Sequence, residues 1–254
     1  MTVPVKEGRW KTVMGEMIQG GRTTYGHRVG ILMSDSNIPR IPGDPGHAET
    51  FDFPVVYEVL KDFPFQDLID VKKDHLDILV SRARALEAKG VELVVADCGL
   101  FGYFQEDLEK ALSVPFIGSS LDMIPLIGRF LPAGTKVGIL TGDTRILKKA
   151  HLAASGVSPQ EVVLAGMEES EEFRRVVLER ELSLDPGKMR DDAVSAALKL
   201  KNKNIGALVI ECTNLITFRQ DIQEALNVPV YDLVSLIEFW VSGSKKKIFT
   251  SRFL

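Results

Sequence analysis

The two cysteines of this chain lie in two stretches of sequence that match each other. Cys98 and Cys212 are its only cysteines, and residues 95–115 align with residues 209–229 without a gap. Eight of the 21 aligned positions are identical, against about one expected by chance, which indicates an internal duplication. We therefore expect two copies of one unit, each with a thiol at the same place. Two equivalent thiols that face each other suit a reaction that takes a proton from one face of a carbon and returns one to the other.

A second pair of matching segments supports the duplication. Residues 28–35 (RVGILMSD) align with residues 136–143 (KVGILTGD). Each segment is a short run of branched apolar residues that ends in small and polar ones. This pattern is typical of a buried parallel strand that opens into a loop at its carboxyl end.

The remainder of each half alternates between apolar runs of strand length and longer helical stretches. Strands that alternate with helices form a parallel sheet with helices on both faces, so the predicted fold class is α/β. Helices are predicted over residues 65–89, 104–112, 121–131, 145–155, 173–181, 185–203 and 233–241, with another that ends at residue 226, and further strands over residues 91–96, 115–117, 161–164 and 207–211 and at residue 230.

Residues 37–64 have no evident counterpart in the second half and are rich in proline, glycine and aromatic residues. A long irregular connection inside a compact domain is often a functional lid. This one leaves the first strand at its carboxyl end, so we expect it to lie over the ligand-binding cleft. Arg40 lies within it and can clamp an anionic substrate, although a solvated arginine is the more common outcome.

The ends of the matched strands supply candidate site residues, because ligands of parallel α/β sheets bind beyond the carboxyl ends of the strands. The candidates are Asp35 and Ser36, Cys98 and Gly99, Asp143 and Thr144, and Cys212 and Thr213. Asp35 can equally cap a loop, and Ser36 and Thr144 can cap helices.

Each cysteine is predicted to follow a strand and to stand a few residues ahead of a helix. Backbone N–H groups and the positive end of the helix dipole are expected to lower the pKa of the thiol there. A thiolate so formed can act as the base for a carbon acid, and one cysteine must start as thiolate while the other starts as thiol. The alternative is a pair of buried core cysteines, since free cysteine is among the most buried residue types.

Composition excludes several other classes of protein. The net charge of −4 gives no electrostatic case for nucleic-acid binding. No stretch is apolar for the roughly 18 residues that a membrane span needs. The first 21 residues lack the apolar core of a secretion signal, so we expect a cytoplasmic protein with reduced thiols. Two cysteines without a C-x-x-C spacing also argue against a structural metal site.

Three motifs in this order resemble the aspartate/glutamate/hydantoin racemase superfamily: Asp35-Ser36, Ala96-Asp97-Cys98 and Glu211-Cys212-Thr213. The resemblance covers residues 28–241. It implies two pseudosymmetric α/β lobes with the active site in the cleft between them, and Cys98 and Cys212 as the acid/base pair. It also implies that the enzyme uses no cofactor, neither pyridoxal phosphate nor a metal. By the same analogy the C-terminal helix packs on the first lobe, which assigns residues 1–120 and 233–254 to that lobe and residues 121–232 to the second. The segment Pro42-Gly43-Asp44 looks like that of a poorly characterised branch.

The chain departs from the family pattern at two places. Gly99-Leu100 stand where racemases of the glutamate type have Asn-Thr, so only backbone donors are available there, and Asn214 stands where the family often has His or Glu. The resemblance implies racemisation or epimerisation of a small carboxylate-containing substrate, such as aspartate, glutamate or a hydantoin, by a protein that can be a homodimer. Three alternatives stay open: a maleate-isomerase-like enzyme, a decarboxylase-like enzyme of the same superfamily, and a small-molecule binding protein without turnover.

Overall fold

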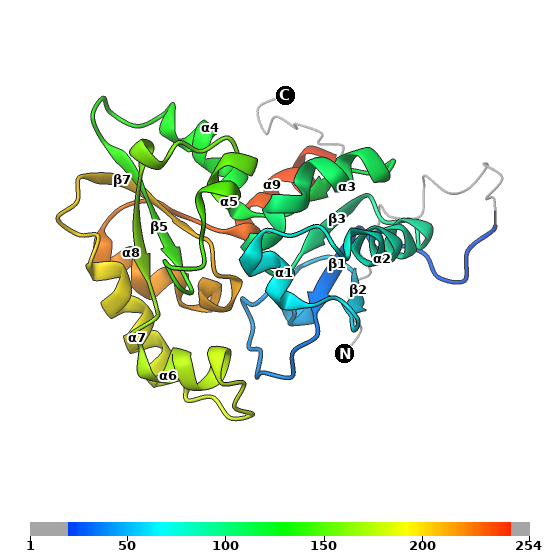
Figure 1. The fold of residues 1–254 in the computed structure, drawn as a ribbon, viewed down its shortest axis with the longest axis horizontal. Helices are drawn as coiled ribbons and strands as arrows, with labels where there is room; N and C mark the ends of the chain where they lie inside the picture. The colour runs from blue at the N-terminus through cyan, green and yellow to red at the C-terminus, as the bar shows by residue number, and fades with distance from the viewer. Residues whose placement is uncertain (1–19, 245–254) are drawn as a thin grey trace, which may run out of the picture.

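Two parallel sheets, one in each half of the chain, form the framework of the computed structural model, which describes residues 20–244 (Figure 1). The N-terminal stretch that we read for a secretion signal lies almost entirely outside these residues, as do the two ends of the predicted first lobe. Within the described part of the chain, no helix is both long enough and apolar enough to cross a membrane.

The first sheet has the strand order β2-β1-β3-β4, and all its strands are parallel. Its strands are β1 (Val29–Ser34), β2 (Val55–Leu60), β3 (Leu93–Ala96) and β4 (Phe116–Ile117). Every residue of β3 is buried, as expected of a central strand with both faces covered.

The second sheet repeats this arrangement with the order β6-β5-β7-β8, again all parallel. Its strands are β5 (Lys136–Thr141), β6 (Val162–Gly166), β7 (Ile205–Ile210) and β8 (Val230–Tyr231). The equal strand order confirms the predicted α/β fold with two pseudosymmetric lobes. The prediction that residues 37–64 have no counterpart is wrong in part, because they contain β2, which pairs with β1 as β6 pairs with β5.

Helices cover both faces of the sheets (Figure 1). They are α1 (Phe65–Asp70), α2 (Leu76–Ala88), α3 (Gln105–Ala111), α4 (Ile124–Gly128), α5 (Lys149–Ala154), α6 (Glu171–Phe173), α7 (Pro186–Leu198), α8 (Arg219–Leu226) and α9 (Leu233–Ser244). The predicted helix over residues 173–181 is instead the end of α6 followed by a π-helical turn, Arg174–Leu178.

The predicted continuous helix over residues 65–89 is wrong, since the chain forms two helices with a break after Asp70. Val71 adopts a left-handed conformation with φ of 56°, and its N–H donates to Asp67 O. A left-handed residue ends a helix by satisfying its last carbonyl groups. Valine rarely adopts this conformation, because its branched Cβ is crowded there, so nothing in the sequence marked the break.

A glycine at the same position of β1 and β5 lets a covering side chain approach the strand closely. A Cβ on Gly30 would stand 3.0 Å from Leu86 Cβ, and one on Gly138 would stand 3.1 Å from Leu200 Cδ1. Leu86 belongs to α2, and Leu200 follows α7. The duplication thus preserves the close approach of a leucine side chain to a glycine of the first strand, as well as the strand order.

Alternate residues along each strand enter two separate apolar clusters, one on each face of the sheets. In β1, Ile31 belongs to one cluster and Leu32 to the other. Each cluster contains residues of both sheets, so the apolar core continues from one half of the molecule into the other. At the end of α9, Ser244 Oγ accepts a hydrogen bond from Arg28, just before β1.

Candidate active site

Cys98 and Cys212 occupy the same place in the two halves of the fold. Cys98 follows β3 and precedes a 3₁₀ helix, Gly99–Phe104, that leads into α3. Cys212 follows β7 and precedes a 3₁₀ helix, Thr213–Phe218, that leads into α8. Both thiols are free and partly exposed. The matching stretches of sequence therefore form matching structures.

The residue before each cysteine is a buried acid, and the two acids are held alike. Asp97 N donates to Leu32 O at 3.0 Å, and Glu211 N donates to Leu140 O at 2.8 Å. Leu32 and Leu140 are equivalent positions of β1 and β5. These carboxylates are not among the site residues predicted from the sequence, although the alignment of the two halves pairs them. An acidic residue directly before each cysteine was the available signal.

Both cysteines line one cavity of about 510 Å³, whose lining residues come from both halves of the chain. A cavity of this size accommodates a small molecule. Its polar wall includes Asp97, Glu211 and Arg40. Four aromatic side chains contribute to its apolar wall, namely Phe63, Phe65, Phe101 and Phe173.

Six of the residues predicted to bind substrate line this cavity: Asp35, Ser36, Arg40, Leu100, Thr213 and Asn214. Three others, Gly99, Asp143 and Thr144, do not line it. Asp143 forms an ion pair with Arg145, and Thr144 Oγ1 donates to Glu168 at 2.7 Å. The binding roles stay predictions, and the cavity gives no support for Asp143 and Thr144.

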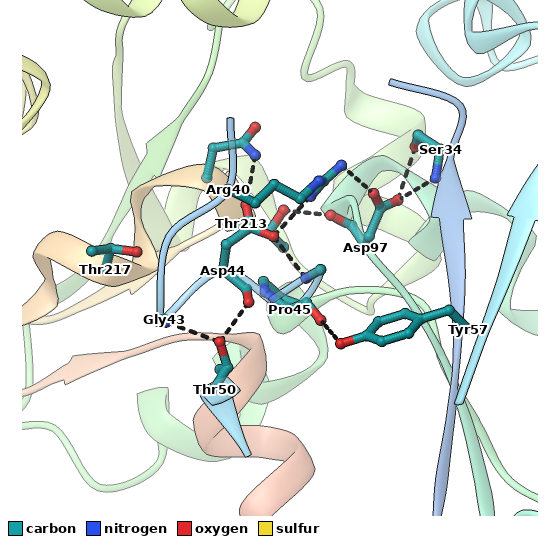
Figure 2. A network of polar contacts seen from close by, with 12 residues as sticks. Ser34, Arg40, Gly43, Asp44, Pro45, Thr50, Tyr57, Asp97, Thr213 and Thr217 are labelled. Carbon is teal, nitrogen blue, oxygen red and sulfur yellow. Dashed lines mark hydrogen bonds and ion pairs between the residues drawn. The ribbon is translucent and has the colours of Figure 1, made fainter. Parts of the chain in front are cut away.

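Arg40 lies between two carboxylates at the edge of the cavity (Figure 2). Its Nη1 contacts Asp44 Oδ1 at 2.8 Å, and its Nη2 contacts Asp97 Oδ2 at 3.0 Å. Asp97 Oδ1 accepts two further bonds, from Ser34 N at 2.9 Å and Ser34 Oγ at 2.8 Å. Arg40 is therefore not a solvated arginine, and its charge is already balanced inside the protein.

Hydrogen bonds join the segment after β1 to the second half of the molecule. Asn214 Nδ2 donates to Asp44 Oδ2 at 2.9 Å, and Thr217 Oγ1 donates to Pro42 O at 2.9 Å. Gly43 lies against Thr217, since a Cβ on Gly43 would stand 2.7 Å from Thr217 Cα. Figure 2 shows this segment close to Thr217. The segment predicted to be a lid thus places the Arg40 side chain at the cavity, and hydrogen bonds link the segment to the second half of the molecule.

The pKa of each thiol is raised, which contradicts the expectation that the helices would lower it. Burial is the main cause for both Cys98 and Cys212, and the negative charge of Glu211 is the second. Backbone N–H groups at Leu100 and Asn214 act in the opposite direction. The helices that follow directly are single 3₁₀ segments, so they contribute local N–H groups rather than a long aligned dipole.

The surroundings of the two thiols differ in polarity. Cys212 Sγ donates to Asn214 Oδ1 at 3.9 Å. The residue at the equivalent position beside Cys98 is Leu100, which is buried and apolar. The side chain two residues after the cysteine is therefore a polar partner in one half and an apolar group in the other.

Glu211 is a buried carboxyl group at this site. Thr141 Oγ1 donates to its Oε2 at 2.7 Å, and burial raises its pKa to about 7. A carboxyl group with such a pKa changes its charge within the physiological range. Within residues 20–244, no three or more His, Cys, Asp or Glu side chains are grouped so that they could hold a metal ion.

These features define a class of protein, namely a two-lobed parallel α/β protein whose internal repeat brings two cysteines to one cavity. The chain belongs to the Asp/Glu/hydantoin racemase family, because the model of that family matches residues 62–237, more than half of the chain.

Relatives of known name carry more than one activity. The chain is 28% identical over 227 residues to a dimethylsulfoniopropionate lyase of Durusdinium sp. clade D, covering 85% of this chain and 74% of that protein. It is 26% identical to dimethylsulfoniopropionate lyase 3 of Emiliania huxleyi, covering 82% of this chain and 57% of that longer protein. Among solved structures, allantoin racemase from Klebsiella pneumoniae has a TM-score of 0.58 at 17% identity, covering 89% of this chain and 97% of that one. This last likeness is one of fold.

Proposed function

We propose that this protein is an enzyme that racemises or epimerises a small carboxylate-containing substrate by a two-base mechanism, with Cys98 and Cys212 as the bases. The observation that carries the proposal is that the two cysteines, equivalent in the repeat, line one cavity. A site that must treat both faces of one carbon alike needs two like groups from opposite sides. The internal repeat provides such a pair.

In this reaction one cysteine is a thiolate and removes the proton from the carbon next to the substrate carboxylate. The electron pair that is left delocalises onto the carboxylate as an enolate, and the second cysteine, a thiol, delivers its proton to the opposite face. The roles are exchanged in the reverse direction. Ser36 and backbone N–H groups at the strand ends are the donors proposed for the substrate carboxylate. Arg40 contributes less to this binding, because both of its terminal nitrogens are paired with carboxylates.

The test is incorporation of solvent deuterium at the α-carbon. Single enantiomers of amino acids, hydantoins and hydroxy acids are incubated with the protein in D₂O, and exchange is followed by NMR while the enantiomer ratio is followed by chiral chromatography. The proposal predicts that at least one substrate exchanges and racemises together. Absence of exchange across such a panel, with tight binding of one of its members, would instead indicate a binding protein.

A second candidate is elimination from a cationic substrate, and two observations favour it. Relatives at 28% and 26% identity are named dimethylsulfoniopropionate lyases. The lining of the cavity also combines three carboxylates, those of Asp35, Asp97 and Glu211, with four aromatic side chains, and the cations of Arg40, Lys61 and Arg180 line it as well. Carboxylates beside aromatic side chains are typical surroundings for an organic cation such as a sulfonium group.

In the elimination, a thiolate takes the proton from the carbon next to the carboxylate, and a carbon–carbon double bond forms to the neighbouring carbon. The carbon–sulfur bond breaks, and its electron pair leaves with dimethyl sulfide, so acrylate remains. This reaction needs one base. Dimethyl sulfide measured by gas chromatography after incubation with dimethylsulfoniopropionate identifies the lyase. Dependence on only one of the two cysteines would further separate elimination from two-base racemisation.

A further inference from the structure

We infer that Glu211 controls the protonation of the two thiols: as a neutral acid it allows a thiolate to form, and as a carboxylate it keeps Cys98 and Cys212 protonated. Its catalytic consequence rests on the proposed function, whereas its effect on the thiols can be measured without a substrate. Glu211 acts through the cysteines, so it is a positioning residue for the proton and is not proposed to contact the substrate.

The position of Glu211 brings one carboxyl group to both cysteine-bearing segments. Glu211 directly precedes Cys212 at the end of β7, and its side chain reaches the first half of the molecule. There its Oε1 lies against Gly99, the neighbour of Cys98, so that a Cβ on Gly99 would overlap it. An alanine in place of Gly99 would occupy the space that the Glu211 carboxyl group now fills.

The two carboxyl oxygens of Glu211 are in different situations. Oε2 accepts the bond from Thr141 Oγ1 at 2.7 Å. Oε1 is buried and has no hydrogen-bond partner among the described residues, and the whole residue is only 3% exposed. A buried carboxylate oxygen without a donor is costly, which favours the protonated form of the group.

Coulomb repulsion then couples the carboxyl group to the thiols. The negative charge of Glu211 raises the pKa of both Cys98 and Cys212, and burial raises the pKa of Glu211 itself to about 7. Two negative charges in this poorly solvated region are disfavoured, so a Glu211 carboxylate and a thiolate exclude each other. The thiolate form arises when the proton of one thiol is held by the carboxyl group, which leaves the net charge of the site unchanged and requires no other reactant.

The other charged groups near the thiols are less suited to this role. Asp97 also raises the pKa of Cys98, but its two oxygens are bonded to Ser34 and Arg40. Asp44 raises the pKa of Cys212 and Arg40 lowers it, and these two residues are paired with each other. Of the three carboxyl groups that raise the pKa of a thiol, Glu211 is thus the one that is not paired with Arg40.

The experiment measures the rate of thiol alkylation by iodoacetamide against pH, in the absence of any substrate. Wild-type protein is compared with Glu211→Gln, with Cys98→Ser and Cys212→Ser versions of each so that the thiols are followed one at a time. Glu168→Gln is the matched control, because Glu168 is bonded to Thr144 in the same half of the chain and does not line the cavity.

Glu211→Gln is expected to alkylate roughly tenfold faster at pH 7.5, since a neutral amide does not repel the thiolate. Glu168→Gln is expected to match wild type. An unchanged or slower rate in Glu211→Gln, with both thiols still accessible after unfolding, would overturn the inference.

A second variant keeps the inference testable if Glu211→Gln does not fold. Thr141→Val removes the hydroxyl group that stabilises the carboxylate, so Glu211 stays protonated to higher pH and alkylation at neutral pH becomes faster. A rate equal to that of wild type in Thr141→Val would count against the inference. Deuterium exchange of substrates tests the proposed function separately, so the two can fail independently.

Discussion

Arg40 Nη2 lies 3.0 Å from Asp97 Oδ2, so the loop after β1 is paired with the carboxylate directly before Cys98. The side chains of Arg40 and Asp97 are only 13% and 2% exposed. Because the Arg40 cation is buried and already paired with carboxylates, it stabilises the structure of the site and contributes less to binding a substrate.

Arg40→Met is expected to destabilise the protein by about 3–5 kcal/mol, because it leaves buried carboxylates without their cation. Urea denaturation measures the loss. Arg82→Met is the control, since Arg82 pairs with Glu58 at the surface with 37% of its side chain exposed, and it should cost no more than about 1 kcal/mol. Equal losses in the two variants would show that the Arg40 ion pairs contribute little.

Gly43→Ala tests the contact between the loop and the second half of the molecule. Gly43 has φ of 107°, and its added Cβ would stand 2.7 Å from Thr217 Cα. Gly134→Ala introduces similar backbone strain at φ of 82° with nothing within 4 Å. Gly43→Ala should therefore lose about 1–3 kcal/mol more stability than Gly134→Ala. The same loss of stability in both variants would mean that the loop moves away from Thr217 at no cost in free energy.

Val71→Gly is expected to stabilise the protein by up to about 1 kcal/mol. The left-handed conformation costs a branched residue about 1–2 kcal/mol, which glycine avoids. Part of this gain is offset because glycine loses more conformational freedom on folding than valine does. Thermal unfolding measures the gain. Val80→Gly, within the right-handed turns of α2, should instead be destabilising. Loss of stability in Val71→Gly would show that the valine side chain stabilises more by packing than it costs by strain.

Asp122→Asn is expected to change the pH dependence of stability. Burial raises the pKa of Asp122 to about 6, from the ordinary value of 3.8. A folded-state pKa above the unfolded one means that the stabilisation is full below pH 3.8 and is lost as the pH rises through 6. The free energy of unfolding of the asparagine variant should therefore exceed that of wild type at pH 7 by at most about 3 kcal/mol. This difference should disappear near pH 4. Urea midpoints at the two pH values test this, and a pH-independent difference would contradict it.

Much of the fold could be predicted from sequence, because the strands are short apolar runs whose ends are marked by small and polar residues. Residues 29–34 and 137–141 show this pattern. The internal repeat also indicated that each of them is followed, later in its half of the chain, by a strand that ends at a cysteine. Strand β2 was missed because it is embedded in a segment rich in proline, glycine and aromatic residues. The break at Val71 was missed because its conformation opposes the intrinsic preference of valine.

The candidate site could be predicted mainly where a residue stands at or just after a strand end. Asp35, Ser36 and Thr213 line the cavity for that reason, whereas Asp143 and Thr144 turn to nearby partners. The role inferred for Glu211 depends on the space left by Gly99, which comes from the other half of the chain. Contacts between residues so distant in sequence leave no local pattern.

The central claim, that Cys98 and Cys212 are bases on two sides of one substrate, is tested most directly by deuterium exchange with single enantiomers in D₂O. Wild type should exchange and racemise a substrate from either enantiomer. Cys98→Ala and Cys212→Ala should each abolish racemisation, while each can retain exchange of one enantiomer, opposite in the two variants. Racemisation that persists in either variant would contradict the claim.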